Sequence, residues 1–522
     1  MRKILIYDTT LRDGSQGEGI SYSVYDKIRI ASQLDDFGIH YIEGGWPGSN
    51  PKDMEFFLKM SKHPLKISKL VAFGSTRRPN ISVTEDANIK GLLKAKVDTV
   101  TIFGKTWDLH IREVLKTSLE ENLNMIRDTI SFLVSKGLTV FYDPEHFFDA
   151  YKANKEYTIK CLLTAQEAGA SAIVLCDTNG GSLTSEIFKI VSEVRPKIKV
   201  LLGIHCHNDC GLAVANSIAA VEAGADMVQG TINGYGERCG NADLIPIIAN
   251  IKLKLGLDCV DTEKLKQLTY LSYFVSEISN MTLRNDQPYV GSSAFAHKGG
   301  VHINAVMKNP KSYEHIDPEV VGNKRRILVS ELAGKSGIIV YAKNLNLDLN
   351  KDDPKTKKIL KLVQNLEHKG YHFEAAEASF ELLLKRAFRQ YKKFFELESF
   401  RVVVEKHKDK EITSEAIIKL KIKGTKEHTA AEGDGPVNAL DNALRKALYN
   451  FYPTLSKMHL SDFKVRVLDA KEGTAAKVRV LITSQDQNGS WSTIGVSENI
   501  IEASWQALVD SIEYKLLKDI KK

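Results

Sequence analysis

Three short segments, far apart in the chain, carry side chains that together could hold a metal ion. They read YDTTLRDG at 7–14, GIHCHND at 203–209 and YGERCGN at 235–241. Asp13 offers a carboxylate, His205 and His207 offer imidazoles, and Asn241 offers an amide oxygen. Alternate residues of a β-strand point to the same face, so a His-x-His pair on a strand presents both rings together.

Two imidazole nitrogens combined with two oxygens suit a divalent cation such as Mn²⁺, Zn²⁺ or Mg²⁺, with coordination positions left for a substrate. A His-x-His pair alone is a weak signal for a metal site. The hypothesis therefore depends on whether the fold brings the three segments together.

The first 255 residues alternate short apolar runs with longer amphipathic ones. The strand candidates are Ile4–Tyr7, Tyr41–Gly44, Leu70–Phe73, Thr99–Phe103, Thr139–Tyr142, Ala172–Leu175, Val200–Ile204 and Met227–Thr231. The clearest helical patterns between and after them are Val24–Phe37, Leu119–Lys136, Asn154–Ala168, Leu212–Glu222 and Asp243–Leu255. This rhythm predicts a (β/α)₈ TIM barrel in the α/β class. A doubly wound sheet is the rival fold, but it would spread the strand ends along a crevice.

Polar residues capable of chemistry follow directly after these strands. They are Arg12, Asp13, Glu43, Lys105, Asp143, Glu145, Asp177, Thr178, His205, His207 and the segment 233–241. In a barrel, the carboxyl ends of the strands converge on one mouth, where active sites are built. The barrel would therefore gather the candidate ligands at one place.

A chain of 522 residues is expected to form two or three domains. We expect the barrel at 1–257, a mainly helical subdomain that contributes to the active site at 258–392, and an α+β regulatory or dimerisation domain at 393–522. The last domain shows what looks like a duplicated strand-strand-helix pattern. It carries no cluster of catalytic residue types.

The composition of the chain indicates which kinds of partner the protein binds and in which cellular compartment it works. The 72 basic and 65 acidic residues are interspersed and leave a net charge of only +7, which argues against a nucleic-acid partner. No apolar run reaches the roughly 18 residues that a membrane span needs, and the start of the chain lacks a signal-peptide pattern. Six cysteines without zinc-knuckle spacing suggest reduced thiols. We expect a cytoplasmic protein with no membrane partner.

The three motifs occur together with HKGGVH at 297–302 and AEGDGPVNAL at 431–440. In this combination the chain resembles the metal-dependent barrel family that contains the 2-isopropylmalate, homocitrate and citramalate synthases. The resemblance covers nearly the whole chain. It implies an acyltransferase of branched-chain amino-acid biosynthesis that condenses acetyl-CoA with a 2-oxo acid and hydrolyses the resulting thioester.

Several segments are most similar to the branch of this family that uses pyruvate as the acceptor, in a route towards isoleucine. They read YIEGGWPGSNPKD, AFGSTRR, IFGKTWD, YDPEHFFD and CDTNGG. The alternative is 2-oxoisovalerate as acceptor, as in 2-isopropylmalate synthases of leucine biosynthesis. A lyase or a carboxyltransferase on the same barrel, or a ligand sensor without activity, are further alternatives. A lyase would not need the last domain, and no lysine is placed beside the His-x-His pair to serve a carboxyltransferase.

The resemblance also implies roles for residues of the barrel. Asp13, His205 and His207 would bind the metal, with Asn241 as a weaker ligand. Arg12 would bind substrate and stabilise the developing negative charge, although a structural ion pair is the plainer interpretation of this residue.

Three more residues complete the implied site. Thr178 would bind the acceptor carboxylate, although an N-cap role for the next helix is about as good an explanation from sequence. Glu145 would orient His302 as general base, and Tyr313 would serve the hydrolytic half-reaction. The resemblance further implies a homodimer and an amino-acid effector, with isoleucine as the first candidate.

Overall fold

The computed structural model describes residues 2–328, 338–339, 341–343, 345, 347, 353–409, 411–468, 475–487 and 489–520. The chain divides into two compact units. Unit 1 comprises Met1–Phe295 and Ile316–Arg325, and unit 2 comprises Ala296–His315 and Arg326–Lys522. Part of the segment expected to form the helical subdomain, including 329–337 and 348–352, lies outside the described residues.

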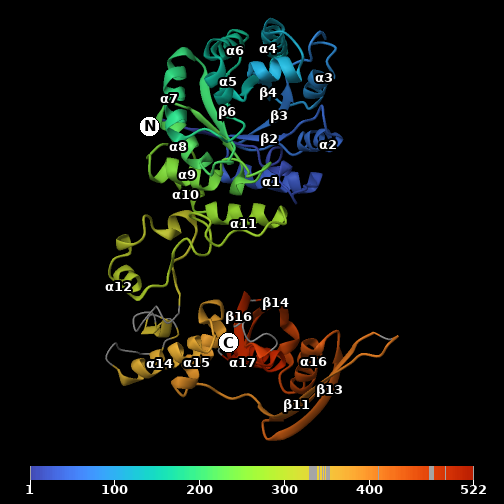
Figure 1. Cartoon of the computed structure of the whole chain (residues 1–522), viewed down its shortest axis with the longest axis vertical. Coiled ribbons are helices and arrows are strands. Elements are labelled where there is room, and N and C mark those ends of the chain that lie inside the picture. The colour runs from blue at the N-terminus through green and yellow to red at the C-terminus, as the bar shows by residue number, and fades with distance from the viewer. Residues whose placement is uncertain are drawn as a thin grey trace. The chain divides into compact units, whose positions relative to one another are not determined.

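Unit 1 is built on a closed barrel of eight parallel strands in sequence order, which confirms the predicted fold class (Figure 1). The strands are β1 (Leu5–Asp8), β2 (Tyr41–Gly45), β3 (Lys69–Ser75), β4 (Thr99–Lys105), β5 (Thr139–Glu145), β6 (Ala172–Asp177), β7 (Leu201–Cys206) and β8 (Met227–Gly230). The barrel closes where Leu5 of β1 pairs with Met227 of β8. Apolar side chains such as Phe141 and Val174 fill its interior, so the barrel is a packed core and not a pore.

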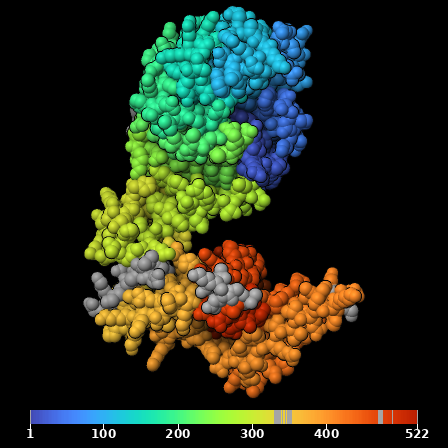
Figure 2. All heavy atoms as spheres, in the orientation of Figure 1, coloured from blue at the N-terminus to red at the C-terminus, as the bar shows by residue number. Residues whose placement is uncertain are grey.

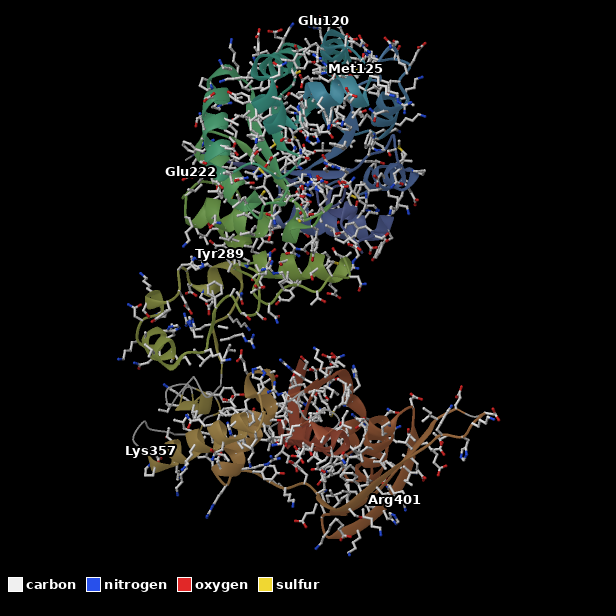
Figure 3. All side chains as sticks on the ribbon, in the orientation of Figure 1. Glu120, Met125, Glu222, Tyr289, Lys357 and Arg401 are labelled. Carbon is white, nitrogen blue, oxygen red and sulfur yellow. The ribbon has the colours of Figure 1, made fainter. Side chains whose placement is uncertain are left out.

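Helices surround the barrel strands and shield their outer faces. They are α1 (Val24–Phe37), α2 (Pro51–Met60), α3 (Ala87–Lys94), α4 (Leu119–Ser135), α5 (Phe147–Ala153), α6 (Lys155–Glu167), α7 (Thr184–Val194), α8 (Ala213–Glu222) and α9 (Leu244–Leu253), with α10 (Thr262–Leu265) and α11 (Leu268–Ile278) after them. Helix α4 shows the pattern: Met125 is buried, whereas Glu120 in the first turn is on the surface (Figure 3). In the space-filling view, the atoms of the barrel unit form one closely packed body, coloured from blue to green along the chain (Figure 2).

His40, just before β2, gives the barrel a pH-dependent contribution to stability. Its Nδ1 accepts a hydrogen bond from the Ile6 N–H at 3.0 Å. Burial, reinforced by the charge of Lys3, lowers the pKa of the imidazole from 6.5 to about 4. The unfolded chain therefore binds a proton between these pH values that the folded chain does not bind. This contribution is complete above pH 6.5 and is lost as the pH falls through about 4.

We expect His40→Asn to flatten the pH dependence of the unfolding free energy. The asparagine oxygen can still accept from Ile6 but does not titrate. Between pH 7 and 4, the unfolding free energy of the wild type should fall by up to about 3 kcal/mol more than that of the variant. This figure follows from about 1.4 kcal/mol for each unit of pKa shift. Urea unfolding of both proteins at several pH values measures this difference. Identical pH slopes would show that His40 is not a source of the acid sensitivity.

Unit 2 begins with β9 (Ala296–His297), which pairs with β10 (Arg326–Ile327), and it also contains α12 (Gly300–Lys308), α14 (Pro354–His368) and α15 (Glu377–Ala387). Two similar αβ modules follow. The first contains β11 (Glu396–Glu405), β12 (Thr413–Ile422), β13 (Thr425–Gly433) and α16 (Pro436–Leu448). The second contains β14 (His459–Val467), β15 (Val478–Asp486), β16 (Gly489–Ser497) and α17 (Ile500–Ile520).

The duplication is therefore present, but the predicted strand-strand-helix order is wrong by one strand in each module. Each module is an antiparallel three-stranded sheet followed by a helix, and β13 and β16 lie at the sheet edges. β13 reads TKEHTAAEG, which lacks the apolar run that marks a buried strand. An edge strand with a solvated face needs little apolar content, so its sequence resembles a loop.

Helix α15 shares an apolar core with the second module. Ala378 and Leu382 of α15 lie in one cluster of buried side chains with Trp491 of β16 and Leu508 of α17. The predicted domain boundary at 392–393 thus falls directly after a helix that packs on the C-terminal sheet. None of the described helices is long and apolar enough to cross a membrane.

Candidate metal centre and active site

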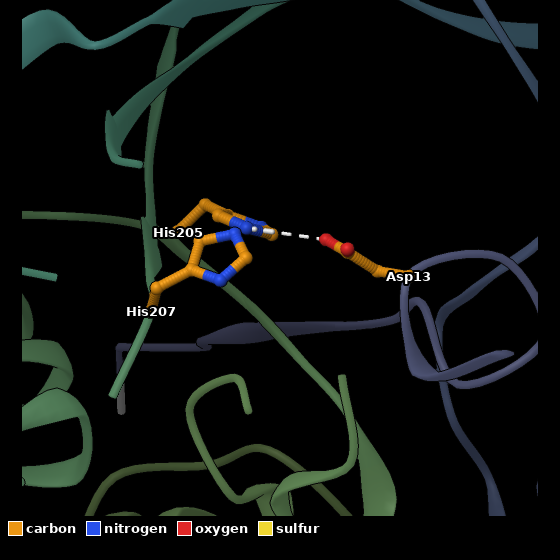
Figure 4. Close-up of side chains that lie close together, drawn as sticks. All are labelled: Asp13, His205 and His207. Atoms are coloured by element: carbon orange, nitrogen blue, oxygen red, sulfur yellow. Dashed lines mark ion pairs between the residues drawn. The ribbon is translucent and has the colours of Figure 1, made fainter. Parts of the chain in front are cut away.

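Asp13, His205 and His207 come together at the mouth of the barrel. One ligand atom from each of the three residues lies within 4.8 Å of the others, and all three side chains are buried. The two imidazoles, from β7 and the residue after it, face the Asp13 carboxylate across the mouth (Figure 4). His205 Nε2 lies 3.4 Å from Asp13 Oδ2. The fold therefore assembles three of the four predicted ligands into a cluster of suitable size.

A tight turn after β1 holds Asp13 in this position. The N–H groups of Arg12 and Gly14 both donate to the carbonyl of Thr9, at 3.2 and 3.0 Å. The Asp13 N–H donates to the Thr9 hydroxyl at 3.3 Å. The Thr9 hydroxyl in turn donates to Glu43 at 2.6 Å, which ties the turn to β2.

Asn241 reaches the cluster through the glycine-rich turn that follows β8. A bridge joins the backbones of His207 and Asn241, and a hydrogen bond from the Asn241 amide group helps to keep the pKa of Asp13 low. Gly236 has φ +155°, and a Cβ there would lie 2.1 Å from Asn241 Nδ2. The GERCGN motif therefore needs glycine at 236 so that the Asn241 side chain can occupy this position.

The protonation states of the cluster suit a divalent cation. Burial lowers the pKa of His205, and burial with the charge of His205 lowers that of His207 to about 4, so both rings are neutral near pH 7. Burial alone would raise the pKa of Asp13, but the charge of Arg12 brings it below its ordinary value. Neutral imidazoles and an ionised carboxylate are the forms that bind metal.

Two buried polar atoms of the cluster also lack a hydrogen-bond partner among the described residues. They are His207 Nδ1 and Asn241 Oδ1. Buried polar atoms are normally paired, and an unsatisfied one calls for an explanation such as an ion. Both atoms belong to predicted ligand residues, so the donor set fits a divalent metal.

Arg12 lies beside the cluster, held from three sides. Its Nε donates to Glu43 at 2.6 Å, its Nη1 lies 3.3 Å from Asp13 Oδ2, and its guanidinium carbon lies 3.9 Å above the Phe73 ring. Burial opposes its charge, but Asp13 and Glu43 raise the pKa of Arg12, so the guanidinium stays charged. Arg12 therefore makes structural ion pairs, which are the plainer interpretation of this residue. It also lines the cavity at the mouth of the barrel.

A cavity of about 220 Å³ opens above the cluster. Trp46, Phe73 and Phe103 line one side of it, with ring centroids 5.4–5.8 Å apart. Sequence reasoning missed this aromatic wall, although Phe73 and Phe103 end two predicted strands and Trp46 follows a third. Aromatic residues in strands are usually assigned to the core, and only the closed barrel shows that these rings border the cavity.

Glu145 and Thr178 also line the cavity, as the sequence predicted for strand ends. Glu145 forms an ion pair with Lys105, the residue opposite it on the neighbouring strand. The Thr178 hydroxyl accepts a hydrogen bond from the His146 N–H at 2.9 Å. Thr178 is not an N-cap, because α7 begins six residues later, at Thr184.

His302 and Tyr313 lie in unit 2. His302 is in the first turn of α12, and its ring centroid lies 4.3 Å from that of Tyr313. The two predicted residues are therefore neighbours. The nearby His297, which the sequence left without a role, pairs with buried Glu314 at 3.0 Å.

Comparison with known protein families matches three consecutive segments of the chain. Residues 3–274 match the family described as HMGL-like, residues 289–370 match the homocitrate synthase post-HMGL domain-like family, and residues 374–516 match the LeuA allosteric (dimerisation) domain.

Full-length relatives narrow the assignment further. The chain is 57 % identical to the (R)-citramalate synthase of Aquifex aeolicus and 56 % identical to that of Geobacter sulfurreducens, in each case over 99 % of this chain and 98 % of the relative. The 2-isopropylmalate synthase of Methanocaldococcus jannaschii is 32 % identical over 99 % of this chain and 95 % of its own length. The chain therefore belongs to the HMGL-like family and, within it, to the group that contains the (R)-citramalate and 2-isopropylmalate synthases.

Proposed function

We propose that this protein is an acyltransferase that condenses acetyl-CoA with pyruvate and hydrolyses the thioester, giving (R)-citramalate and CoA. The observation that carries the proposal is the high identity to (R)-citramalate synthases over the full chain, combined with a cluster of three ligand residues at the barrel mouth. The more distant identity to 2-isopropylmalate synthases makes 2-oxoisovalerate the second candidate acceptor.

The proposed metal ligands are Asp13, His205 and His207, with Asn241 as a weaker ligand. A bound divalent metal would act as a Lewis acid towards the keto and carboxylate oxygens of the acceptor. Mn²⁺, Zn²⁺ and Mg²⁺ all suit this set of nitrogen and oxygen donors.

Arg12 and Thr178 are proposed to bind and polarise the substrates. The fixed Arg12 guanidinium can stabilise negative charge that develops on an oxygen during carbon–carbon bond formation, because Glu43 holds it in place before the reaction begins. Thr178 lines the same cavity and carries a hydroxyl group that can donate to the acceptor carboxylate.

His302 is proposed as the base that removes a proton from the acetyl methyl group, with Glu145 as its orienting carboxylate. The resulting carbanion attacks the keto carbon of pyruvate, the electron pair of the carbonyl π bond moves to the oxygen, and this oxyanion takes up a proton to become the hydroxyl group. Water then cleaves the thioester and CoA leaves as the thiol, with Tyr313 assigned to this half-reaction. Support for these three roles comes from the HKGGVH and YDPEHFFD motifs and from the short distance between the His302 and Tyr313 rings.

The aromatic wall is proposed to select a small acceptor. Trp46, Phe73 and Phe103 border one side of a cavity of about 220 Å³, and bulky rings in this position would limit the size of the acceptor side chain. We expect kcat/KM to fall from pyruvate to 2-oxobutyrate to 2-oxoisovalerate, by a factor that corresponds to about 1–3 kcal/mol for each added methylene. Spectrophotometric detection of the released thiol measures all three acceptors.

A variant of the wall separates pocket size from other causes of selectivity. Phe103→Leu should raise the 2-oxobutyrate to pyruvate ratio of kcat/KM, whereas Phe132→Leu on α4 should leave this ratio unchanged. A higher kcat/KM for 2-oxoisovalerate than for pyruvate in the wild type would favour 2-isopropylmalate synthase as the function.

The C-terminal domain is proposed to form a homodimer and to bind an amino-acid effector, with isoleucine first and leucine second. The match to an allosteric (dimerisation) domain supports this role. Gly433 ends β13 and lies close to the first turn of α16, since a Cβ at Gly433 would lie 2.3 Å from the Ala439 nitrogen.

We expect Gly433→Ala to weaken inhibition by isoleucine at least several-fold, because the start of α16 must shift, while the uninhibited kcat changes little. Titration of full-length enzyme with isoleucine, followed by thiol release, measures both quantities. A point variant is preferable to removal of the domain, since deletion would expose the apolar face of α15. An unchanged half-inhibitory concentration would place the effector elsewhere.

A further inference from the structure

A buried glutamine lies directly behind one of the proposed metal ligands. Gln229 on β8 is fully buried, and its Oε1 lies 3.0 Å from Nδ1 of His205 on β7. Its Nε2 lies 3.4 Å from Oδ1 of Asp143 on β5. A chain of polar contacts thus runs through the barrel interior from Asp143 through Gln229 to His205.

The direction of this chain determines which nitrogen of His205 carries the proton. An amide offers one acceptor atom and one donor atom. When Gln229 Nε2 donates to the carboxyl group of Asp143, Gln229 Oε1 faces His205 Nδ1, which must then carry the hydrogen. The lone pair of His205 is left on Nε2, the nitrogen that lies 3.4 Å from Asp13.

The reverse arrangement would block the site. A Gln229 amide turned by 180° would present its N–H₂ group to His205 Nδ1, and the proton of the ring would then move to Nε2. A protonated Nε2 cannot bind a metal ion. In neutral histidine, one ring nitrogen carries the hydrogen and the other can bind a metal. A hydrogen-bond acceptor beside one nitrogen keeps the hydrogen there and leaves the other nitrogen free to bind.

We propose that Gln229 and Asp143 are positioning residues that hold His205 as the Nδ1–H tautomer and so keep its Nε2 available to a divalent cation. The inference rests on the proposed metal site and adds Gln229, which lies in none of the sequence motifs, and Asp143, which lies in the YDPEHFFD motif but had no assigned role. Gln229 acts on the metal through His205, and Asp143 acts through Gln229.

The test compares Mn²⁺ affinities of full-length, metal-depleted proteins by titration calorimetry. Gln229→Leu keeps the side-chain volume but removes the acceptor for Nδ1–H, and Mn²⁺ binding should weaken by about 10–100-fold. Gln229→Glu restores an acceptor, and its affinity should stay within about threefold of the wild type or become tighter. Gln166→Leu, on the outer helix α6, is the matched control and should not change the affinity.

A second measurement detects the tautomer itself. In metal-free protein labelled with [¹⁵N]histidine, the His205 signals, identified by comparison with His205→Asn, should show the Nδ1–H pattern in the wild type. In Gln229→Leu they should shift towards Nε2–H. Loss of packing alone would lower stability without this shift.

The outcomes distinguish this inference from the metal site on which it rests. Wild-type protein that binds no Mn²⁺ would refute the site itself. If the wild type binds Mn²⁺ and His207→Ala does not, but Gln229→Leu and Asp143→Leu both keep the wild-type affinity, the metal site stands and the positioning role is wrong. An equally large loss of affinity in Gln229→Glu and Gln229→Leu would also overturn it.

Discussion

His207→Ala should remove both the bound metal and turnover while leaving the fold intact. The variant deletes one of two imidazoles from a cluster whose ligand atoms lie within 4.8 Å of one another. Only Asp13, His205 and Asn241 then remain as ligands. Metal content measured by elemental analysis should fall from about one ion per chain to near zero. Circular dichroism should stay unchanged, because His207 lies after the end of β7 and contributes little to the barrel core.

His110→Ala is the matched control for this experiment. His110 is a partly buried imidazole, with a pKa lowered first by burial and then by the charge of His146, but unlike the buried His207 it does not belong to the cluster. The control should keep both its metal and most of its activity. Full metal occupancy in His207→Ala would contradict the assignment of His207 as a ligand.

Arg12→Ala should lower kcat by about 10²–10³, the cost typical of a lost group that stabilises transition-state charge. The KM for acetyl-CoA should change far less, because the lost interaction develops mainly as charge forms on the reacting oxygen. The variant also leaves Glu43 buried without its cationic partner, which should lower the melting temperature. Arg12→Lys keeps a positive charge and should retain part of the rate.

Arg77→Ala is the control that separates a loss of protein stability from a loss of catalytic rate. Arg77 forms ion pairs with Glu121 and Asp128 at 2.7 Å, and it does not line the cavity. Its side chain is 7 % exposed, compared with 14 % for Arg12. It should lower the melting temperature without a comparable loss of kcat. If Arg12→Ala behaves like Arg77→Ala, with reduced stability and near-normal turnover, then Arg12 has only the structural role.

The barrel could be predicted because parallel strands that are covered on both faces consist of nearly continuous apolar runs. Polar residues at the carboxyl ends of such strands stand out, which is why Asp13, His205 and His207 could be singled out from the sequence as residues that lie together. Gln229 was not found, because it lies within β8 and a single glutamine in a buried strand carries no motif. Its contacts with His205 and Asp143 join three different strands, and only the closed barrel places them together.

The modules of unit 2 illustrate a different limit of sequence reasoning. Helices α16 and α17 carry apolar stripes that mark them in the sequence, whereas β13 and β16 do not alternate clearly. At the sheet edge, half of the backbone hydrogen-bonding groups and one face of the strand can be solvated. This explains β13, none of whose side chains is buried, but not β16, in which Trp491, Thr493 and Ile494 are buried.

The most direct test of the account is to follow the carbon–carbon bond itself. Enzyme supplied with a divalent metal, pyruvate and acetyl-CoA labelled with ¹³C at the methyl carbon should give free CoA and citramalate in equal amounts. NMR should place the label in the methylene carbon next to the new carboxylate, and chiral chromatography should identify the R enantiomer. Thiol release without labelled citramalate, or a label that remains in acetate, would contradict the proposed condensation at the barrel mouth.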